Sequence, residues 1–205
     1  MIHGAVILDF HRTGRQSTAG NVYSLILDFS ETSAIVVFMK TSLPVVIFLD
    51  IDGVFVTMET IHQSYVDNGN RQMREDDRPY LKKAVENLNR IVQETGAKVV
   101  ISSSWRITRT IDEMRRIFAK NGIVCDIIGF TANITDERYP DARRGAQIED
   151  WLEFHPVKGY VIIDDSTDML LSQMDNFVKV NPTTGFIDEC LVEKSITILQ
   201  KGKLQ

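Results

Sequence analysis

From residue 44 onward, apolar and polar residues form blocks that predict strands and helices in turn. Short continuous apolar runs such as VVIFLD are typical of strands buried on both faces of a sheet, whereas apolar residues every three or four positions are typical of amphipathic helices. The pattern predicts strands at residues 45–50, 97–104, 124–131, 159–165 and 177–180. It predicts helices at residues 80–96, 110–122, 143–154 and 186–200.

This alternation predicts a Rossmann-like, three-layer α/β/α fold with a mostly parallel sheet. Asp141 is placed to cap the helix that begins at residue 143. Residues 55–79 are polar and show neither periodicity, so they are expected to be irregular, and their EDDRPY edge is expected to be a solvated acidic loop.

The first 40 residues differ from the rest. Apolar runs at residues 5–10, 23–29 and 33–39 predict two or three short strands. One interpretation is that residues 1–40 form a β-rich extension of a domain that spans residues 41–205. The other is that the natural product begins at Met39, because MKTSLPVVIFLD would open directly into the first core strand. Both remain open at this stage.

Composition narrows the class of protein. The chain has 205 residues and a formal net charge of −5, which suits one good-sized domain and argues against broad electrostatic binding of nucleic acid. Cys125 and Cys190 form neither a disulfide framework nor the spacing of a zinc site. Because no apolar run reaches the roughly 18 residues of a membrane span and the N-terminus does not resemble a signal peptide, a cytoplasmic location is expected.

Polar residues follow three of the predicted strands. In parallel α/β sheets, side chains at the carboxyl ends of neighbouring strands share one crevice, so these residues are expected to face one pocket. A basic pair opens the helix that precedes the last acidic strand. The residues concerned are Asp50 and Asp52; Ser102, Ser103 and Ser104, followed by Trp105 and Arg106; Asp164 and Asp165, followed by Asp168; and the basic pair Arg143 and Arg144.

The residue types indicate phosphoryl chemistry. Several carboxylates without histidine or cysteine suit a hard cation with oxygen ligands, Mg²⁺ above all. Hydroxyl and guanidinium groups can bind the remaining oxygens of a phosphate. An aspartate near the metal can attack phosphorus, and a second one can protonate the leaving oxygen and later activate water.

The sequence resembles the haloacid dehalogenase (HAD) superfamily of phosphohydrolases. Asp50-x-Asp52-Gly53-Val54, a strand-end serine, a basic residue and Asp164-Asp165 are similar to its four motifs, over about residues 44–200. ISSSWR, RRGAQIEDWL and YVIIDDSTDM resemble the small-cap HAD domains grouped with the Swiss Army Knife RNA repair proteins. The resemblance implies a small or minimal cap, since the segments at the two insertion points, residues 55–79 and 107–142, are short.

The resemblance also implies roles for individual acids. Asp50 matches the nucleophile and a metal ligand. Asp52 matches the general acid and base, whose backbone carbonyl is a further metal ligand. Asp165 is favoured as the metal ligand of the last strand, with Asp164 in support, and Asp168 matches an additional acid that some members carry nearby.

Other positions leave alternatives open. Ser103 is favoured over Ser102 as the phosphate-binding hydroxyl, because Trp105 then follows two residues later, as in similar proteins. The basic motif is matched best by Arg144, and less well by its neighbour Arg143. Trp105 and Arg106 are expected either to contact substrate or to support the structure.

The expected function is that of a Mg²⁺-dependent phosphomonoester hydrolase that forms an aspartyl-phosphate at Asp50. Its substrate would be a phosphorylated small molecule or a nucleic-acid end, so a polynucleotide end-phosphatase or a nucleotidase is the alternative. A non-catalytic HAD-like module that binds a phosphorylated partner or serves in assembly is the alternative of another class. The sequence does not predict an oligomeric state.

Overall fold

The computed structural model of the chain describes residues 6–9, 22–30, 33–71, 74–133 and 141–203. Contacts divide the chain into two compact units, one up to Leu43 and the other from Pro44 onward. In the first unit, β1 (Val6–Asp9), β2 (Val22–Ser30) and β3 (Ser33–Thr41) form an antiparallel sheet in that order. Met39 lies within β3, and its use as a natural start stays a prediction.

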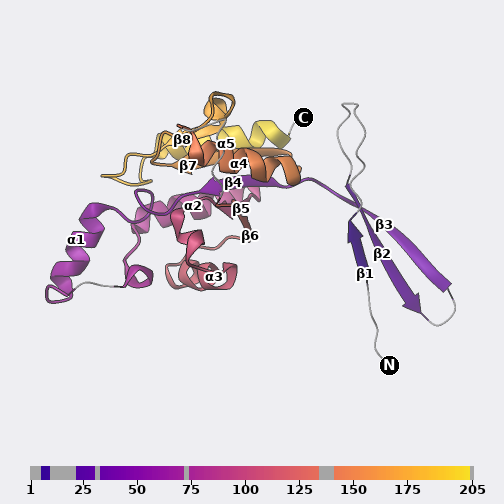
Figure 1. Cartoon of the computed structure of the whole chain (residues 1–205), viewed down its shortest axis with the longest axis horizontal. Coiled ribbons are helices and arrows are strands. Elements are labelled where there is room, and N and C mark those ends of the chain that lie inside the picture. The colour runs from indigo at the N-terminus through magenta and orange to yellow at the C-terminus, as the bar shows by residue number, and fades with distance from the viewer. Residues whose placement is uncertain (1–5, 10–21, 31–32, 72–73, 134–140, 204–205) are drawn as a thin grey trace. The chain divides into compact units, whose positions relative to one another are not determined.

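The second unit is built on a sheet of five parallel strands, in the order β6-β5-β4-β7-β8 (Figure 1). The prediction of a three-layer, Rossmann-like α/β fold is therefore confirmed. The strands are β4 (Val45–Leu49), β5 (Lys98–Ile101), β6 (Ile127–Phe130), β7 (Gly159–Asp164) and β8 (Phe177–Lys179).

The connections of this unit are mostly helical. The α-helices are α1 (Met58–Asp67), α2 (Lys82–Thr95), α3 (Ile111–Lys120), α4 (Arg143–Phe154) and α5 (Glu189–Lys203). Short 3-10 helices are η1 (Glu75–Asp77), η2 (Ser104–Ile107) and η3 (Leu171–Asn176). Among the described residues, none of the helices is both long and apolar enough to cross a membrane.

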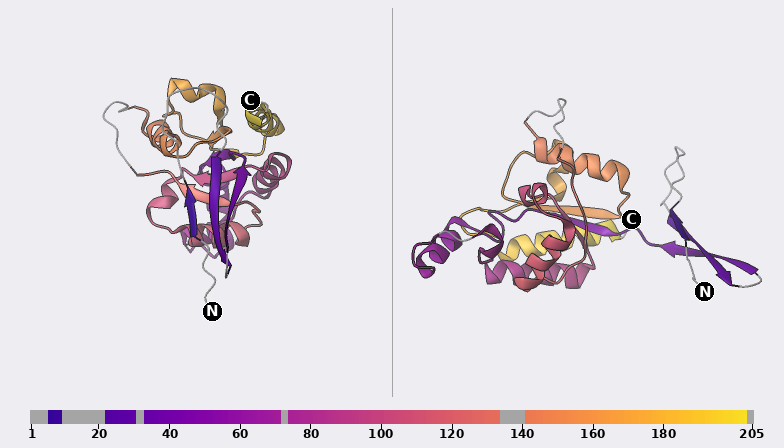
Figure 2. Two further views of the ribbon diagram at one scale, coloured as in Figure 1. Left: turned by 90° about the vertical axis from the view of Figure 1, so that its right-hand side faces the viewer. Right: turned by 60° about the horizontal axis from the view of Figure 1, so that its bottom comes forward.

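The central strand β4 buries both of its faces, and alternate residues join different cores. Ile47 and Leu49 pack in the core that includes apolar residues of α2, α3 and α5. Phe48 packs in the core that includes Ile148 and Trp151 of α4, and it meets the Trp151 ring edge-on at a centroid distance of 5.4 Å. Figure 2 (right) shows α4 on one side of the sheet and α2, α3 and α5 on the opposite side. The core to which a strand residue belongs thus identifies the face of the sheet on which its side chain lies.

Two details of the prediction are wrong. Residues 55–79 are not irregular throughout, because they contain α1 and η1. Reciprocal capping between Thr57 and Thr60 starts α1, and Ser64 is its only buried residue, so this helix carries no apolar periodicity to detect.

The second error concerns the start of α4. Asp141 does not cap this helix: its N-cap is Ala142, which makes no side-chain capping bond. Instead Asp168, from the loop after β7, accepts a 2.9 Å hydrogen bond at Oδ2 from the backbone N–H of Arg144. The cap is supplied by tertiary contact, which sequence spacing does not reveal.

Candidate active site

The loop after β4 is a tight turn centred on Gly53. The carbonyl of Ile51 accepts hydrogen bonds from the backbone N–H groups of Val54, Phe55 and Val56, at 2.9–3.2 Å. Gly53 has φ of +72°, and a Cβ atom there would lie 2.3 Å from Asp165 Oδ2. A glycine therefore satisfies both the left-handed backbone and the close approach of a carboxylate.

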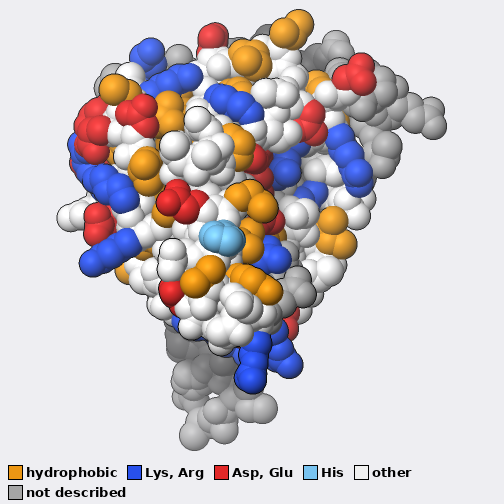
Figure 3. Space-filling view, turned by 90° about the vertical axis from the view of Figure 1, so that its left-hand side faces the viewer, with side chains coloured by type: hydrophobic (Ala, Val, Ile, Leu, Met, Phe, Trp, Pro, Cys, Tyr) orange, Lys and Arg blue, Asp and Glu red, His pale blue; other side chains and the backbone are white. Residues whose placement is uncertain are grey.

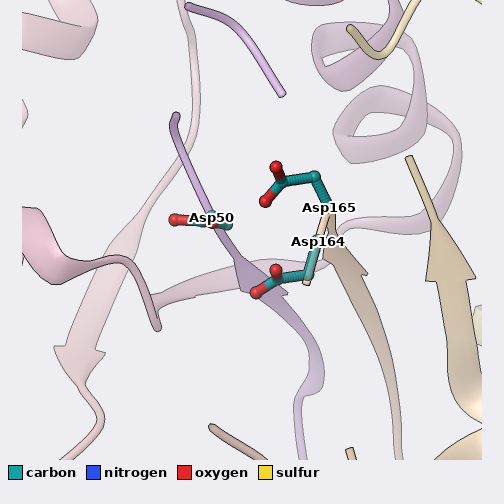
Figure 4. Close-up of side chains that lie close together, drawn as sticks. All are labelled: Asp50, Asp164 and Asp165. Carbon is teal, nitrogen blue, oxygen red and sulfur yellow. The ribbon is translucent and has the colours of Figure 1, made fainter. Parts of the chain in front are cut away.

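Three carboxylates meet at the carboxyl ends of two adjacent strands. Asp50 follows β4 and Asp164 ends β7, and the two strands pair in register through Leu49 and Ile163. One oxygen from each of Asp50, Asp164 and Asp165 lies within 4.8 Å of the others. In Figure 4 the side chains of Asp164 and Asp165 are directed to the side on which Asp50 lies. The structure thus brings together acids separated by more than 110 positions in the chain, as the sequence predicts.

These carboxylates lie in an environment that penalises their charge. Asp50 and Asp164 are 4% and 0% exposed, and Asp165 is half-buried. Burial, followed by the charge of Asp50, raises the pKa of both Asp164 and Asp165 above the ordinary range. Asp164 Oδ2 is buried and makes no hydrogen bond to the described residues, although Arg144 Nη1 lies 3.2 Å away outside hydrogen-bonding geometry. This all-oxygen donor set fits a divalent cation such as Mg²⁺.

Arg144 is the basic residue of the cluster. Its Nη1 donates to the carbonyl of Ser102 at 2.6 Å and lies 3.4 Å from Asp50 Oδ1. Burial alone would lower the pKa of Arg144, but the charges of Asp50 and Asp164 outweigh burial and raise it, so the guanidinium is cationic. Arg143 is exposed and donates to Asn133 Oδ1 at 3.1 Å, away from the three carboxylates. The geometry therefore agrees with the choice of Arg144 over its neighbour.

The structure favours Ser102, rather than Ser103, as the hydroxyl of this site. Val100 packs in the core of α4 and Ile101 in the opposite core, so the period-2 alternation of a strand puts Ser102 on the face that also carries Asp50. Ser102 Oγ is buried and makes no hydrogen bond to the described residues. Ser103 Oγ instead accepts from Trp105 N, at 3.5 Å, and caps η2. The sequence preference for Ser103 rested on motif spacing, whereas strand alternation was the signal that distinguishes the two.

Asp52 lies outside the group of three carboxylates. Its Oδ2 accepts a 2.8 Å hydrogen bond from Trp105 Nε1, and its Oδ1 lies 3.9 Å from Arg78 Nη1. The Asp52 side chain is 45% exposed, so solvent reaches it. The proposed coordination by its backbone carbonyl stays a prediction.

Trp105 and Arg106 hold neighbouring residues of the site in position. Trp105 is 1% exposed, and the guanidinium carbon of Arg109 lies 4.2 Å from its ring centroid, so Trp105 offers no open platform for a substrate. Arg106 donates at 2.6 Å to the carbonyls of Ser102 and Ser103, which fixes the end of β5. Arg106 also donates at 2.9 Å to the carbonyl of Thr131 and at 2.5 Å to Gln147 Oε1.

Asp168 fixes the start of α4 and thereby the position of Arg144. Besides the bond from Arg144 N, its carbonyl accepts from Gly145 N at 2.9 Å, and its Oδ1 accepts from the Ser166 hydroxyl. Burial raises the pKa of Asp168, but the hydrogen bonds that its carboxylate accepts from Ser166 and from Arg144 N, with the charge of Arg144, outweigh burial and lower it. Asp168 is thus a fixed anion that supports the basic residue rather than a fourth member of the carboxylate group.

Arg78 is the residue that sequence reasoning missed. It belongs to EDDRPY, which is not simply solvated: Asp76 Oδ1 accepts from Arg109 Nη2 at 2.6 Å, and Asp77 Oδ1 accepts from Lys120 Nζ at 2.6 Å. These ion pairs hold the segment beside Asp52. Since their partners come from α3 and the loop that precedes it, local sequence gave no signal for them.

Comparison with known proteins agrees with this geometry. Residues 46–191, more than two thirds of the chain, match the family model described as the HAD domain in Swiss Army Knife RNA repair proteins. The match includes Asp50, Ser102, Arg144 and Asp164, the residues that converge at the end of the sheet. No curated protein matches the chain. With the five-stranded parallel sheet and the acidic cluster at its carboxyl end, this match shows that the chain belongs to the HAD superfamily, in the family of HAD domains found in Swiss Army Knife RNA repair proteins.

Proposed function

We propose that the protein is a Mg²⁺-dependent phosphomonoester hydrolase that works through an aspartyl-phosphate at Asp50. The observation that supports this proposal best is the convergence of Asp50, Asp164 and Asp165 within 4.8 Å, with Arg144 against two of them. HAD domains are phosphohydrolase domains in general, and Asp50 and Asp52 retain the two acids that such chemistry uses. Their presence argues against a purely non-catalytic binding module.

In the first step, an Asp50 carboxylate oxygen attacks phosphorus, and the bond from phosphorus to the ester oxygen breaks. Asp52 gives its proton to that leaving oxygen, which departs as an alcohol. In the second step, Asp52 takes a proton from water while the water oxygen attacks phosphorus. The Asp50–phosphorus bond then breaks, so inorganic phosphate leaves and both aspartates return to their starting states.

Other residues bind and orient the phosphate. The Ser102 hydroxyl and the Arg144 guanidinium would hold phosphate oxygens that are not reacting. Asp50, Asp164 and Asp165 would hold Mg²⁺, whose charge would offset the negative charge of the phosphate and of these acids. Asp168 would keep Arg144 in place, and the hydrogen bond that it accepts from Arg144 N supports this role.

Phosphate release from an aryl phosphate in the presence of Mg²⁺ tests the proposal. Wild-type protein should turn over, and Asp50→Asn should not, because an amide cannot act as this nucleophile. Thermal unfolding of the variant should show that its fold is intact. Asp126→Asn, a change in a surface acid that is 53% exposed and pairs with Lys98, is the matched control and should keep activity. Retained turnover in Asp50→Asn would refute the nucleophile assignment.

Two classes of natural substrate are proposed: a nucleic-acid end and a small phosphate ester. The family description names RNA repair proteins, which makes a nucleic-acid end one substrate to test. Figure 3 shows acidic and basic side chains interspersed over the face that carries α1, without a broad region of one sign. We therefore propose a small phosphate ester as the first substrate to test. We also propose that the reaction takes place in the cytoplasm.

A further inference from the structure

A small pocket lies beside the three carboxylates and is lined by arginines. Its wall includes Arg106, Arg143 and Arg144, together with Ser104, Asn133 and Asp168, and its volume is about 150 Å³. Pockets that enclose a whole drug-sized ligand are typically about 300 Å³ or more, so this one suits a single functional group. We refer to it as the arginine pocket.

The charge of the arginine pocket favours an anion. Among the lining residues that the structure describes, three guanidinium groups face one carboxylate, which leaves an excess of positive charge there. Arg106 and Arg144 are half-buried, and Arg143 and Ser104 are exposed at the rim. Guanidinium and hydroxyl groups in a concave site are the donors that bind phosphate oxygens.

The arginine pocket is distinct from the place where phosphorus would react. Its lining does not include Asp50, Asp164 or Asp165, nor either of Ser102 and Ser103. A phosphoryl group bonded to Asp50 therefore does not itself fill the pocket, and a second group would have to do so.

One contact and one chain connection link the pocket to the residues proposed to react. On one side, Arg144 lies 3.4 Å from Asp50 Oδ1. On the other, Ser104 immediately precedes Trp105, whose indole donates to Asp52. The pocket thus shares Arg144 with the proposed nucleophile, and its wall continues in the chain to the residue that holds the proposed acid. A phosphate on the leaving group would reach the pocket on the side that Arg144 shares with Asp50.

We infer that the arginine pocket binds a second phosphate carried by the leaving group, with Arg143 as the main specificity-determining residue. This inference rests on the proposed function, and it narrows the substrate class to esters with two phosphate groups. Such compounds include nucleoside bisphosphates and nucleic-acid ends, whose neighbouring phosphodiester supplies the second group. Arg143 is the informative position because Arg106 binds backbone carbonyls and Arg144 serves the reacting centre.

The test compares kcat/KM for adenosine 3′,5′-bisphosphate with that for the 3′- and 5′-monophosphates. Wild-type protein should prefer the bisphosphate by about tenfold, the scale of one charge-assisted hydrogen bond, and added salt should reduce the preference. Arg143→Gln should bring the ratio close to one, mainly through KM, and Arg143→Lys should restore part of it. The matched control is Arg116→Gln on α3, an exposed arginine outside the pocket, which should leave the ratio unchanged.

A dinucleotide with a terminal phosphate distinguishes the two sources of the second phosphate. If it shows the same dependence on Arg143 and exceeds the free bisphosphate, the substrate is a nucleic-acid end; if the free bisphosphate exceeds it, the substrate is a nucleotide. An unchanged ratio in Arg143→Gln overturns the inference and leaves the proposed phosphatase intact.

Absence of turnover with every ester would refute the proposed function instead. The arginine pocket is then judged by calorimetric titration of Asp50→Asn with adenosine 3′,5′-bisphosphate. Binding about tenfold weaker after the added change Arg143→Gln supports the pocket, and equal binding overturns it.

Discussion

The indole Nε1 of Trp105 donates a 2.8 Å hydrogen bond to Asp52 Oδ2, and this bond joins the end of β5 to the loop after β4. Trp105 is itself held by the guanidinium of Arg109 above its ring, which in turn pairs with Asp76. The carboxylate of Asp52 is therefore held outside the group formed by Asp50, Asp164 and Asp165. A single buried side chain thus gives the proposed acid a partner that the proposed nucleophile does not share, although the two acids lie only two residues apart in sequence.

Trp105→Phe should impair protonation of the leaving group, because phenylalanine fills most of the space but cannot donate to Asp52. We expect about a tenfold loss of kcat for alkyl phosphates, whose leaving groups need a proton, and a smaller loss for p-nitrophenyl phosphate. Kinetics across a series of leaving groups measures the difference. Trp151→Phe removes a tryptophan from the other core and should not change this dependence. Equal losses for all esters would show that Trp105 is only structural.

Ser102→Ala should weaken phosphate binding with little loss of stability, because no hydrogen bond from its Oγ to the described residues is lost. We expect about a tenfold fall in kcat/KM, as for removal of one hydrogen bond to a charged group. Ser103→Ala removes the cap of η2 and should lower the free energy of unfolding by about 0.5–1 kcal/mol. Steady-state kinetics and urea unfolding of both variants decide which serine binds phosphate. A fall in kcat/KM in Ser103→Ala but not in Ser102→Ala would show that Ser103 binds phosphate instead.

Gly53→Ala should abolish activity, because the new Cβ would lie 2.3 Å from Asp165 Oδ2 at a backbone φ of +72°. Gly122→Ala is the matched control: Gly122 has φ of +79°, and nothing lies within 4 Å of the position of its Cβ. Both variants should lose about 1 kcal/mol of stability from the left-handed backbone, but only the first should lose catalysis. Activity in Gly53→Ala equal to that of Gly122→Ala would contradict the close approach.

Mg²⁺ should stabilise the fold, since three clustered carboxylates repel one another. A ligand that binds only the folded state adds about 2.7 kcal/mol at a concentration one hundred times its Kd. Tm measured with increasing Mg²⁺ should rise in wild-type protein and much less in Asp165→Asn. Asp126→Asn keeps the three ligands and should follow the wild type. A Tm that does not respond to Mg²⁺ would contradict the metal site without reference to catalysis.

Glu113 should make stability depend on pH at the start of α3. Its carboxylate accepts hydrogen bonds from the backbone and hydroxyl of Thr110, and these bonds lower the pKa of Glu113 below the ordinary 4.5. A lowered pKa means that the stabilisation is fully present above about pH 4.5 and is lost as pH falls through the folded-state value. Thermal unfolding between pH 6 and pH 3 should show a larger decline in wild-type protein than in Glu113→Gln. Parallel declines would exclude this contribution.

Several features of the site follow from sequence alone. The apolar run that ends at Asp50 and the run that ends at Asp164 predict neighbouring strand ends, because parallel strands bring their carboxyl ends to one edge. The same alternation of faces also distinguishes Ser102 from Ser103 once it is followed past the end of β5. Glycine at position 53 is consistent with a turn, although the sequence does not show that Asp165 approaches it.

Other features depend on residues that are distant in the chain. The cap of α4 comes from Asp168 rather than from the nearby Asp141, and the partner of Asp52 from the EDDRPY segment is Arg78. Helix α1 was not predicted, because Ser64 is its only buried residue and its sequence therefore shows no apolar periodicity. In each case the decisive contact lies between segments whose separation in sequence has no fixed relation to their separation in space.

The amino-acid sequence by itself determined the parallel sheet, its acidic edge and the kind of chemistry that these acids suit, since strand burial and period-2 alternation are local properties. Only the tertiary structure decided that Trp105 holds Asp52 outside the group of the other acids, and that Arg143 and Arg144 line one pocket. Those arrangements depend on side-chain packing and on charges brought together by folding, which no local pattern encodes.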